Sequence, residues 1–148
     1  MNERPGVDII RRTVSGVVIP FIQLFGFYVI VHGDSGPGGG FQGGVILGAS
    51  VILYCLAFGL REARAHMARR TSDILDSAGV LIYAGVGLAA LALGGAFLQY
   101  NVLPLGDPHF ASHIGIFIIE VGVGITVSGV MITIFFATAD RGSGEGGE

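Results

Sequence analysis

Four long apolar stretches, with a single charged residue among them, constrain the fold of this chain more than any other feature of its sequence. They cover residues 13–31, 41–60, 77–98 and 114–139, and their only acidic or basic side chain is Glu120. A helix needs about 20 apolar residues to cross a hydrocarbon core of about 30 Å. The stretches are continuously apolar instead of alternating, which disfavours a β-barrel. We therefore predict an all-α fold: an integral membrane bundle of four transmembrane helices.

Composition excludes an ordinary soluble enzyme. Only 13% of the 148 residues are charged and mean hydropathy is +0.73, whereas soluble domains carry about 25% charged residues. A small domain leaves much of its surface in contact with its surroundings, so a surface this poor in charge indicates lipid. The net charge of −3 gives no support for nucleic-acid binding. No nucleophile and base are arranged as a catalytic pair, so we predict that the chain is not an enzyme.

The positions of the arginines predict the orientation in the membrane. Arginines precede the first stretch, separate the second from the third, and follow the fourth, while residues 32–40 and 99–113 contain none. The eight are Arg4, Arg11, Arg12, Arg61, Arg64, Arg69, Arg70 and Arg141. Positively charged connections stay in the cytoplasm. Both termini are therefore predicted to be cytoplasmic.

The ends of the predicted elements carry further expectations. Ser72 or Asp73 is expected to cap the third helix, since short polar side chains are preferred at that position. Residues 2–12 are expected to form a short interfacial helix. Residues 1–139 form a single membrane domain, and the Gly, Ser and Glu residues at 140–148 predict a disordered cytoplasmic tail.

A glycine-rich run opens the second predicted helix. Residues 36–44 read Gly-Pro-Gly-Gly-Gly-Phe-Gln-Gly-Gly. A dinucleotide fingerprint would need a preceding β-strand, and a P-loop would need a following Lys-Ser or Lys-Thr, so neither interpretation fits. Gly40, Gly44 and Gly48 instead lie four residues apart on one helix face, which favours close helix packing. The residues predicted to form the tight turn or close packing are Pro37, Gly38, Gly39, Gly40, Phe41, Gly43, Gly44, Gly48, Gly122 and Gly124.

The sequence does not decide what these glycine faces contact. The fourth predicted helix offers similar surfaces, through Gly122 with Thr126 and Gly124 with Ser128. One interpretation is that the glycines pack the four helices against each other. The other is that their surplus serves close contact with other subunits.

Glu120 is the candidate functional residue within the membrane. It lies six residues, about 9 Å, from the start of the fourth stretch, in the outer half of the membrane. Intramembrane acids usually face the protein interior, a water cavity or an ion path. His113 lies seven residues earlier on nearly the same face, where an imidazole can pass protons to Glu120. The structural alternatives are a protonated Glu120 bonded to nearby backbone and an ordinary interfacial His113.

No metal site or cofactor is predicted. Three histidines and two aspartates share the predicted outer side, but their positions show no local spacing of metal ligands. These residues are His32, Asp34, Asp107, His109 and His113.

Two motifs resemble a known family. Residues 37–46 read Pro-Gly-Gly-Gly-Phe-Gln-Gly-Gly-Val-Ile, and Glu120 is followed at 121–129 by Val-Gly-Val-Gly-Ile-Thr-Val-Ser-Gly. Both are similar to the MrpB or MnhB family, which supplies one membrane component of Mrp-type multisubunit Na⁺/H⁺ antiporters, over about residues 13–139. The resemblance implies a small cofactor-free subunit in the cell (inner) membrane. Its partners would be lipid and the other membrane subunits of an assembly that exchanges Na⁺ for H⁺.

Three functions are consistent with the sequence. The first is an accessory subunit of a cation/proton antiporter, with Glu120 and His113 in an ion or proton path. The second is a self-contained small homo-oligomeric transporter, although four-helix exporters typically carry their key Glu in the first helix, which has none here. The third is a purely structural adaptor, for example in a membrane-bound hydrogenase-type complex.

Overall fold

The computed structural model describes residues 5–33 and 36–144, which form α-helices, one short 3-10 helix and no strand. The elements are α1 (Pro5–His32), α2 (Gly40–Phe58), α3 (Leu60–His66), α4 (Arg69–Ala92), η1 (Tyr100–Val102) and α5 (Pro108–Gly144). By length and composition, α1, α2, α4 and α5 are able to cross a membrane. The prediction of an all-α fold with four transmembrane helices is confirmed.

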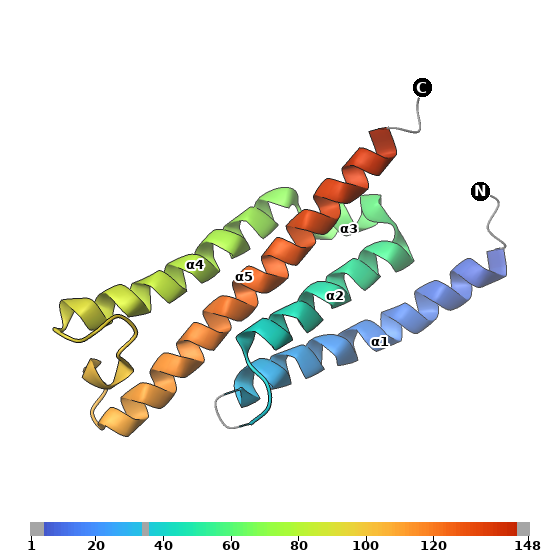
Figure 1. The fold of residues 1–148 in the computed structure, drawn as a ribbon. Helices are drawn as coiled ribbons and strands as arrows, with labels where there is room; N and C mark the ends of the chain where they lie inside the picture. The colour runs from blue at the N-terminus through green and yellow to red at the C-terminus, as the bar shows by residue number, and fades with distance from the viewer. Residues whose placement is uncertain (1–4, 34–35, 145–148) are drawn as a thin grey trace.

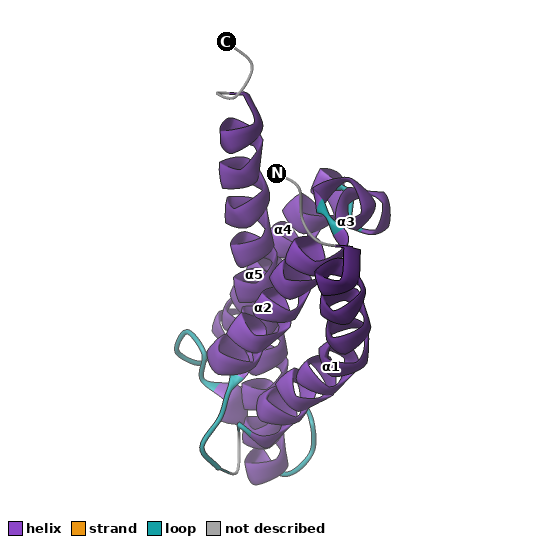
Figure 2. Ribbon diagram, turned by 90° about the vertical axis from the view of Figure 1, so that its right-hand side faces the viewer, coloured by secondary structure: helices purple, strands orange, loops and turns teal. Residues whose placement is uncertain are grey.

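The four long helices stand in an open row in the order α4, α5, α2, α1 (Figure 1). Helix α5 packs between α4 and α2, and α2 packs between α5 and α1. Figure 2 shows the same helices turned by 90°, with α1 at one side and α2, α5 and α4 overlapping beside it. The predicted bundle is therefore not closed on itself, and α1 and α4 form its two edges.

The open row leaves long apolar faces uncovered. Within the most apolar window of each helix, 33% of residues are buried in α2 but only 17% in α1 and in α4. Large side chains such as Leu24 and Leu81 are exposed. Apolar faces of this extent are typical of surfaces that contact lipid or partner proteins.

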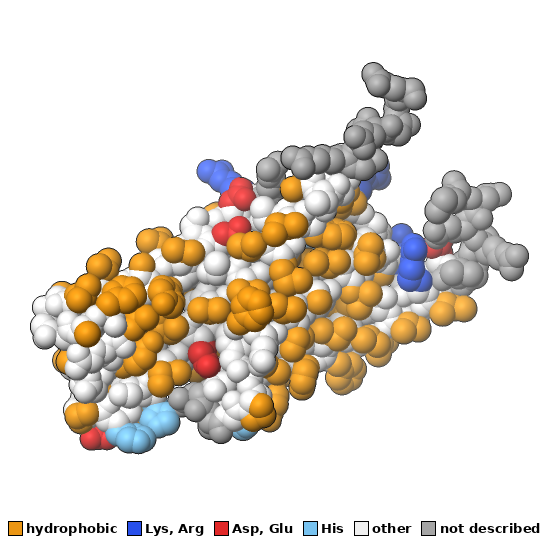
Figure 3. All heavy atoms as spheres, in the orientation of Figure 1, with side chains coloured by type: hydrophobic (Ala, Val, Ile, Leu, Met, Phe, Trp, Pro, Cys, Tyr) orange, Lys and Arg blue, Asp and Glu red, His pale blue; other side chains and the backbone are white. Residues whose placement is uncertain are grey.

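Charge is distributed unequally between the two ends of the row. The start of α1 and the end of α5 lie at one end, which we call the inner end because the arginines predict that it is cytoplasmic (Figure 1). On the face drawn in Figure 3, arginines gather at the inner end and histidines at the opposite, outer end. Arg12 of α1 donates a hydrogen bond of 3.4 Å to the carbonyl oxygen of Phe58 in α2. The structure thus places arginines from different segments at one end.

Helix α4 occupies a different range from the predicted 77–98. It begins at Arg69 after the N-cap residue Ala68, so Ser72 and Asp73 lie inside the helix and do not cap it. It ends at Ala92 because the chain then turns, with Gly94 at a φ of +82°. The apolar residues after Ala92 belong to the outer connection instead of the helix.

Helix α5 is longer than the predicted 114–139. It begins at Pro108, whose fixed φ and missing N–H suit the first position of a helix. At its other end it continues to Gly144, so residues 140–144 are helical instead of part of a disordered tail. An ion pair between Arg64 of α3 and Asp140 holds this part of α5 near α3. Residues 145–148 lie outside the described residues.

Helix α1 starts at Pro5 and runs without a break into the first span. The predicted interfacial helix over residues 2–12 is therefore the beginning of α1 where the structure describes it.

Candidate functional site

The connection from α1 to α2 folds back on the last turn of α1. The backbone N–H of Gly39 donates a hydrogen bond of 3.2 Å to the carbonyl oxygen of Val29. Gly39 has a φ of +137°, a conformation that L side chains rarely adopt, so glycine is required there. The His32 ring covers Gly36, since a Cβ on Gly36 would lie 2.9 Å from two atoms of the ring. We call this connection, residues 33 and 36–40, the glycine turn.

The side chain of Glu120 points from α5 into the glycine turn. A Cβ added to Gly33 would lie 2.6 Å from both carboxylate oxygens, and a Cβ on Gly39 would lie 3.4 Å from Oε1. A Cβ on Gly40 would overlap the carbonyl oxygen of Glu120. The glycines therefore make room for both the carboxylate and the backbone of Glu120. The glycine-rich run and the intramembrane acid Glu120, which are far apart in the sequence, are therefore in contact at the glycine turn.

The position of Glu120 has an electrostatic consequence. Gly39 is the N-cap of α2, so the carboxylate lies beside the N-terminus of that helix. The first backbone N–H groups of a helix have no partner within it, and they carry a partial positive charge that favours an anion. The end of α1 beside Gly33 carries the opposite partial charge. The carboxylate thus lies between two helix ends whose partial charges have opposite sign.

Below the glycine turn, α2 and α5 contact each other through glycines. A Cβ on Gly44 would lie 2.7 Å from the carbonyl oxygen of Gly124, and one on Gly48 would lie 3.1 Å from Met131 Cβ. Gly43 faces the other way, toward the carbonyl oxygen of Gly26 in α1. Helix α2 therefore approaches both neighbours at backbone distance.

Helix α5 uses a second small-residue face against α4. A Cβ on Gly122 would lie 3.0 Å from Ile82 Cγ2, and one on Gly79 of α4 would overlap the hydroxyl of Thr126. Gly122 and Gly124 thus serve opposite neighbours. These glycine faces are occupied within the chain, so they are no evidence by themselves for other subunits.

The remaining predicted residues lie around the outer end of the row. Pro37 and Phe41 are exposed on the glycine turn and at the start of α2. Gly38 packs against the carbonyl oxygen of Val29, where a Cβ would lie 2.8 Å away. His113 is exposed on α5, and its ring centroid is 4.8 Å from that of His109, one turn earlier.

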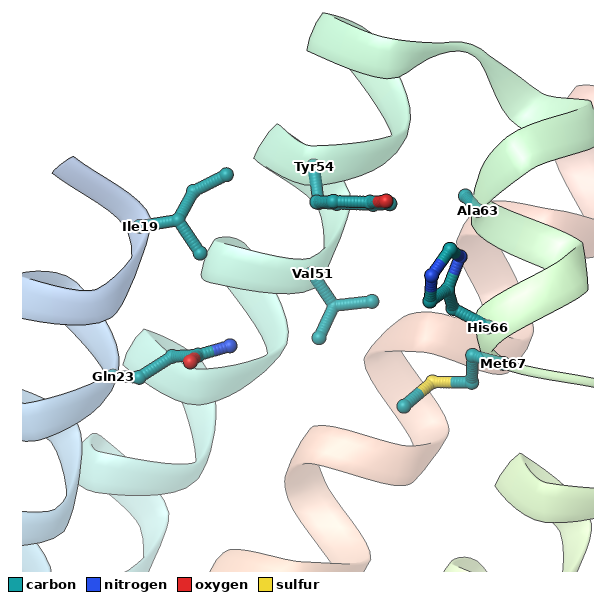
Figure 4. Close-up of a pocket in the computed structure, with 7 residues that line it drawn as sticks. All are labelled: Ile19, Gln23, Val51, Tyr54, Ala63, His66 and Met67. Atoms are coloured by element: carbon teal, nitrogen blue, oxygen red, sulfur yellow. The ribbon is translucent and has the colours of Figure 1, made fainter. Parts of the chain in front are cut away.

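No group of three His, Cys, Asp or Glu side chains able to hold a metal ion occurs in residues 5–33 and 36–144. A cavity of about 330 Å³ opens between α1, α2 and α3 (Figure 4). Its walls are mainly apolar, and its polar groups come from Gln23 of α1, Tyr54 of α2 and His66 of α3. His66 stands edge-on to Tyr54, with 5.8 Å between ring centroids. The cavity lies apart from Glu120, so it is not part of the site at the glycine turn.

Sequence reasoning missed Asp76. The prediction placed it just before the third helix, but it lies inside α4 and accepts a hydrogen bond of 3.3 Å from the hydroxyl of Thr133 in α5. Its position immediately before the uncharged stretch was the available signal. A helix that starts eight residues earlier carries this acid into the candidate span Arg70–Ala92.

The row of four long apolar helices defines the chain as a small multi-pass membrane protein, and one acid, Glu120, lies between two of its helix ends. Residues 10–133 match the family described as "Domain related to MnhB subunit of Na+/H+ antiporter", and the chain belongs to this family. The resemblance seen in the glycine run and in the helix of Glu120 is thereby confirmed.

Curated relatives agree with this assignment over most of the chain. The chain is 34% identical over 135 residues to the putative antiporter subunit mnhB2 of Staphylococcus haemolyticus, covering 88% of this chain and 93% of the relative. It is 34% identical over 135 residues to the protein of the same name in Staphylococcus aureus, again covering 88% of this chain and 93% of the relative. A Na(+)/H(+) antiporter subunit of Bacillus subtilis is 32% identical over 136 residues, covering 86% of this chain and 94% of the relative. The similarity therefore extends to nearly whole proteins.

Proposed function

We propose that this chain is an accessory subunit of a multisubunit Na⁺/H⁺ antiporter in the cell membrane, and that Glu120 forms part of its ion or proton path. The family and the names of the relatives support the first statement. The placement of the Glu120 carboxylate against the glycine turn carries the second. This chain is a transporter subunit, and the chemistry at Glu120 is proton or cation exchange without a covalent step.

The surroundings of Glu120 suit a group that changes its charge. The N-terminus of α2 favours the carboxylate, while the neighbouring apolar helices favour the protonated acid. A partner ion that approaches the glycine turn shifts this balance. Glu120 then releases its proton when the cation arrives and takes it back when the cation leaves.

The open row supports the involvement of other subunits. Helices α1 and α4 each have one long neighbour in the row, and their outward faces are apolar. We infer that antiporter subunits cover part of these faces and that lipid covers the rest. Purification in mild detergent tests this inference: larger membrane subunits should accompany the chain, whereas a homodimer active alone in liposomes would indicate a self-contained transporter.

Glu120→Gln tests the role of Glu120 because it keeps the shape of the side chain and removes its charge. The variant complex, compared in everted membrane vesicles, should lose at least about tenfold in Na⁺-dependent proton exchange, equivalent to about 1.4 kcal/mol. Glu62→Gln is the matched control, since Glu62 is exposed on α3 far from the glycine turn. Equal exchange in both variants, at equal amounts of assembled complex, would show that Glu120 is only structural.

His113 is proposed to relay protons between the outer surface and Glu120. His113 is exposed, and an imidazole ring has two nitrogens that can accept and donate a proton. His113→Gln should therefore lower exchange less than Glu120→Gln and mainly at high pH, where protons are scarce. A pH profile that parallels the unmodified complex would remove His113 from the path.

A further inference from the structure

A second acid lies in the seam between α4 and α5, far from the glycine turn. One carboxylate oxygen of Asp76, Oδ2, accepts the hydrogen bond from the Thr133 hydroxyl. The other, Oδ1, packs against Gly129, where a Cβ would overlap it. Oδ1 is buried and accepts no hydrogen bond from the described residues. Glycine at 129 thus leaves space for a carboxylate that is only half satisfied.

Ser72 adds a second buried oxygen to the same seam. Its residue is 0% exposed, and its hydroxyl has no hydrogen-bond partner in the part of the chain that the structure describes. Ser72 lies four residues before Asp76, on the same face of α4. Thr133 lies four residues after Gly129 on α5, which runs antiparallel to α4 (Figure 1). Since Asp76 lies against Gly129, this spacing places Ser72 and Thr133 at about the same level of the two helices, one turn from that contact.

The three side chains share one chemistry. Each offers an oxygen, and together they carry one negative charge. Buried polar groups without partners are costly in proteins, and a buried carboxylate is more costly than a hydroxyl. Among the described side chains none forms an ion pair with Asp76: Arg64 pairs with Asp140, and Arg70 is exposed. Among the side chains that the structure describes, this seam thus offers oxygen ligands and no positive charge.

We propose that Asp76, Thr133 and Ser72 form a binding site for a monovalent cation of the hard, oxygen-seeking class, with Na⁺ as the occupant. Carboxylate and hydroxyl oxygens match the ligands that hard cations prefer. A single carboxylate balances one positive charge, which favours a monovalent over a divalent ion. Only the choice of Na⁺ rests on the proposed function.

The site is separate from Glu120. Thr133 lies 13 residues after Glu120 on α5, about 20 Å along the helix. Glu120 belongs to the outer end of the row and Asp76 to the inner end. Binding at Asp76 is therefore measurable whether or not Glu120 takes part in transport.

Equilibrium binding of ²²Na⁺ to the purified complex tests this proposal. Asp76→Asn should remove one equivalent of bound Na⁺ per complex. Asp140→Asn is the matched control, because it removes the same charge from an exposed position at the same end of the row, and it should leave binding unchanged. Identical isotherms for the two variants would overturn the proposal.

Hydroxyl variants keep the proposal testable if Asp76→Asn fails to assemble. Thr133→Val preserves shape and removes one ligand, and it should weaken Na⁺ binding at this site about tenfold, with Ser72→Ala causing a smaller loss. Thr133→Ser restores the hydroxyl and should recover most of the affinity. Unchanged affinity in Thr133→Val and Ser72→Ala would show that Asp76 is satisfied by a proton alone. Glu120→Gln should leave this binding intact, which separates failure here from failure of the proposed path.

Discussion

Helix α5 has two faces, one against α2 and one against α4, and glycine plays a different part in the packing of each. Toward α2, Gly124 meets Gly44, and the absence of side chains brings two backbones together. Toward α4, the absence of a side chain at Gly129 leaves space for the Asp76 carboxylate. A glycine in a membrane helix therefore marks either close backbone contact or room for a polar group, and only the neighbour across the seam tells which.

The two acids on these faces, Glu120 and Asp76, also differ in their surroundings. Glu120 points toward a turn at the outer end, beside helix termini that carry partial charge. Asp76 lies between two helices at the inner end, where the Thr133 hydroxyl donates a hydrogen bond to it. In our proposals, the first environment serves proton or cation exchange and the second binds a cation. Substitutions that fill one face without touching the other test this contrast.

The largest effect is expected from Gly40→Ala, which breaks the α2–α5 contact at Glu120. The new Cβ would overlap the Glu120 carbonyl oxygen, so backbone must move. Overpacking of this kind costs about 1–3 kcal/mol. A fall in the thermal midpoint of the detergent-solubilised complex, together with reduced exchange, would measure it.

Gly85→Ala is the control for this substitution. No atom lies within 4 Å of a Cβ at this helical position, and Ala in a helix is favoured over Gly by about 0.5–1 kcal/mol. Gly85→Ala should therefore leave the midpoint unchanged or raise it. If both variants behaved alike, α2 and α5 would not be in backbone contact at Gly40.

The number and type of the long helices followed from the sequence because hydropathy and length depend on local residues alone. Their order in the row did not, since it depends on which small-residue face meets which neighbour. Gly122 and Gly124 are two residues apart and nearly equivalent in sequence, yet they contact α4 and α2 respectively.

Glu120 was easier to predict from the sequence than Asp76 and Ser72, because its position does not depend on where a helix begins. Glu120 stands out because a long apolar stretch surrounds it on both sides. Asp76 lies at the edge of such a stretch. The predicted start of the helix was eight residues too late, so Asp76 was placed outside the membrane span. Ser72 was interpreted as a cap because capping depends on where a helix starts, which is the least certain feature of a sequence prediction. The inward face of α4 became visible only when its start was known.

Gly129→Ala should produce a smaller, more selective effect in the α4–α5 seam. Its Cβ would displace the Asp76 carboxylate while leaving every proposed ligand in the sequence. We expect Na⁺ binding at Asp76 to weaken about tenfold, the equivalent of about 1.4 kcal/mol. Equilibrium binding of ²²Na⁺ to the purified complex measures this change.

Gly124→Ala is the matched control on the opposite face of α5. A Cβ there would lie 2.9 Å from Ile30 Cδ1 and 3.2 Å from the carbonyl oxygen of Gly40, and the Gly40 backbone cannot move aside as easily as a side chain, so the variant should lose stability without losing Na⁺ affinity. Loss of affinity in Gly124→Ala, equal to that in Gly129→Ala, would mean that α5 transmits any disturbance to Asp76. The two faces would then not be independent.

The smallest effect is expected at Asp140, the acid of α5 that lies outside both seams. It pairs with Arg64, but the two side chains are 44% and 43% exposed, so water and salt screen their attraction. Exposed ion pairs contribute about 0–1 kcal/mol, and Asp140→Asn should lower the thermal midpoint only slightly, and less at 1 M salt. The Arg64 guanidinium also lies 5.7 Å from the centre of the Phe136 ring, a contact that the substitution keeps.

Na⁺ binding should be unaffected by Asp140→Asn, because the exposed Asp140 carboxylate is solvated by water and does not lie at the proposed cation site. A loss of bound Na⁺ in Asp140→Asn would instead mean that acids at the inner end act collectively, and that burial between α4 and α5 is not what distinguishes Asp76.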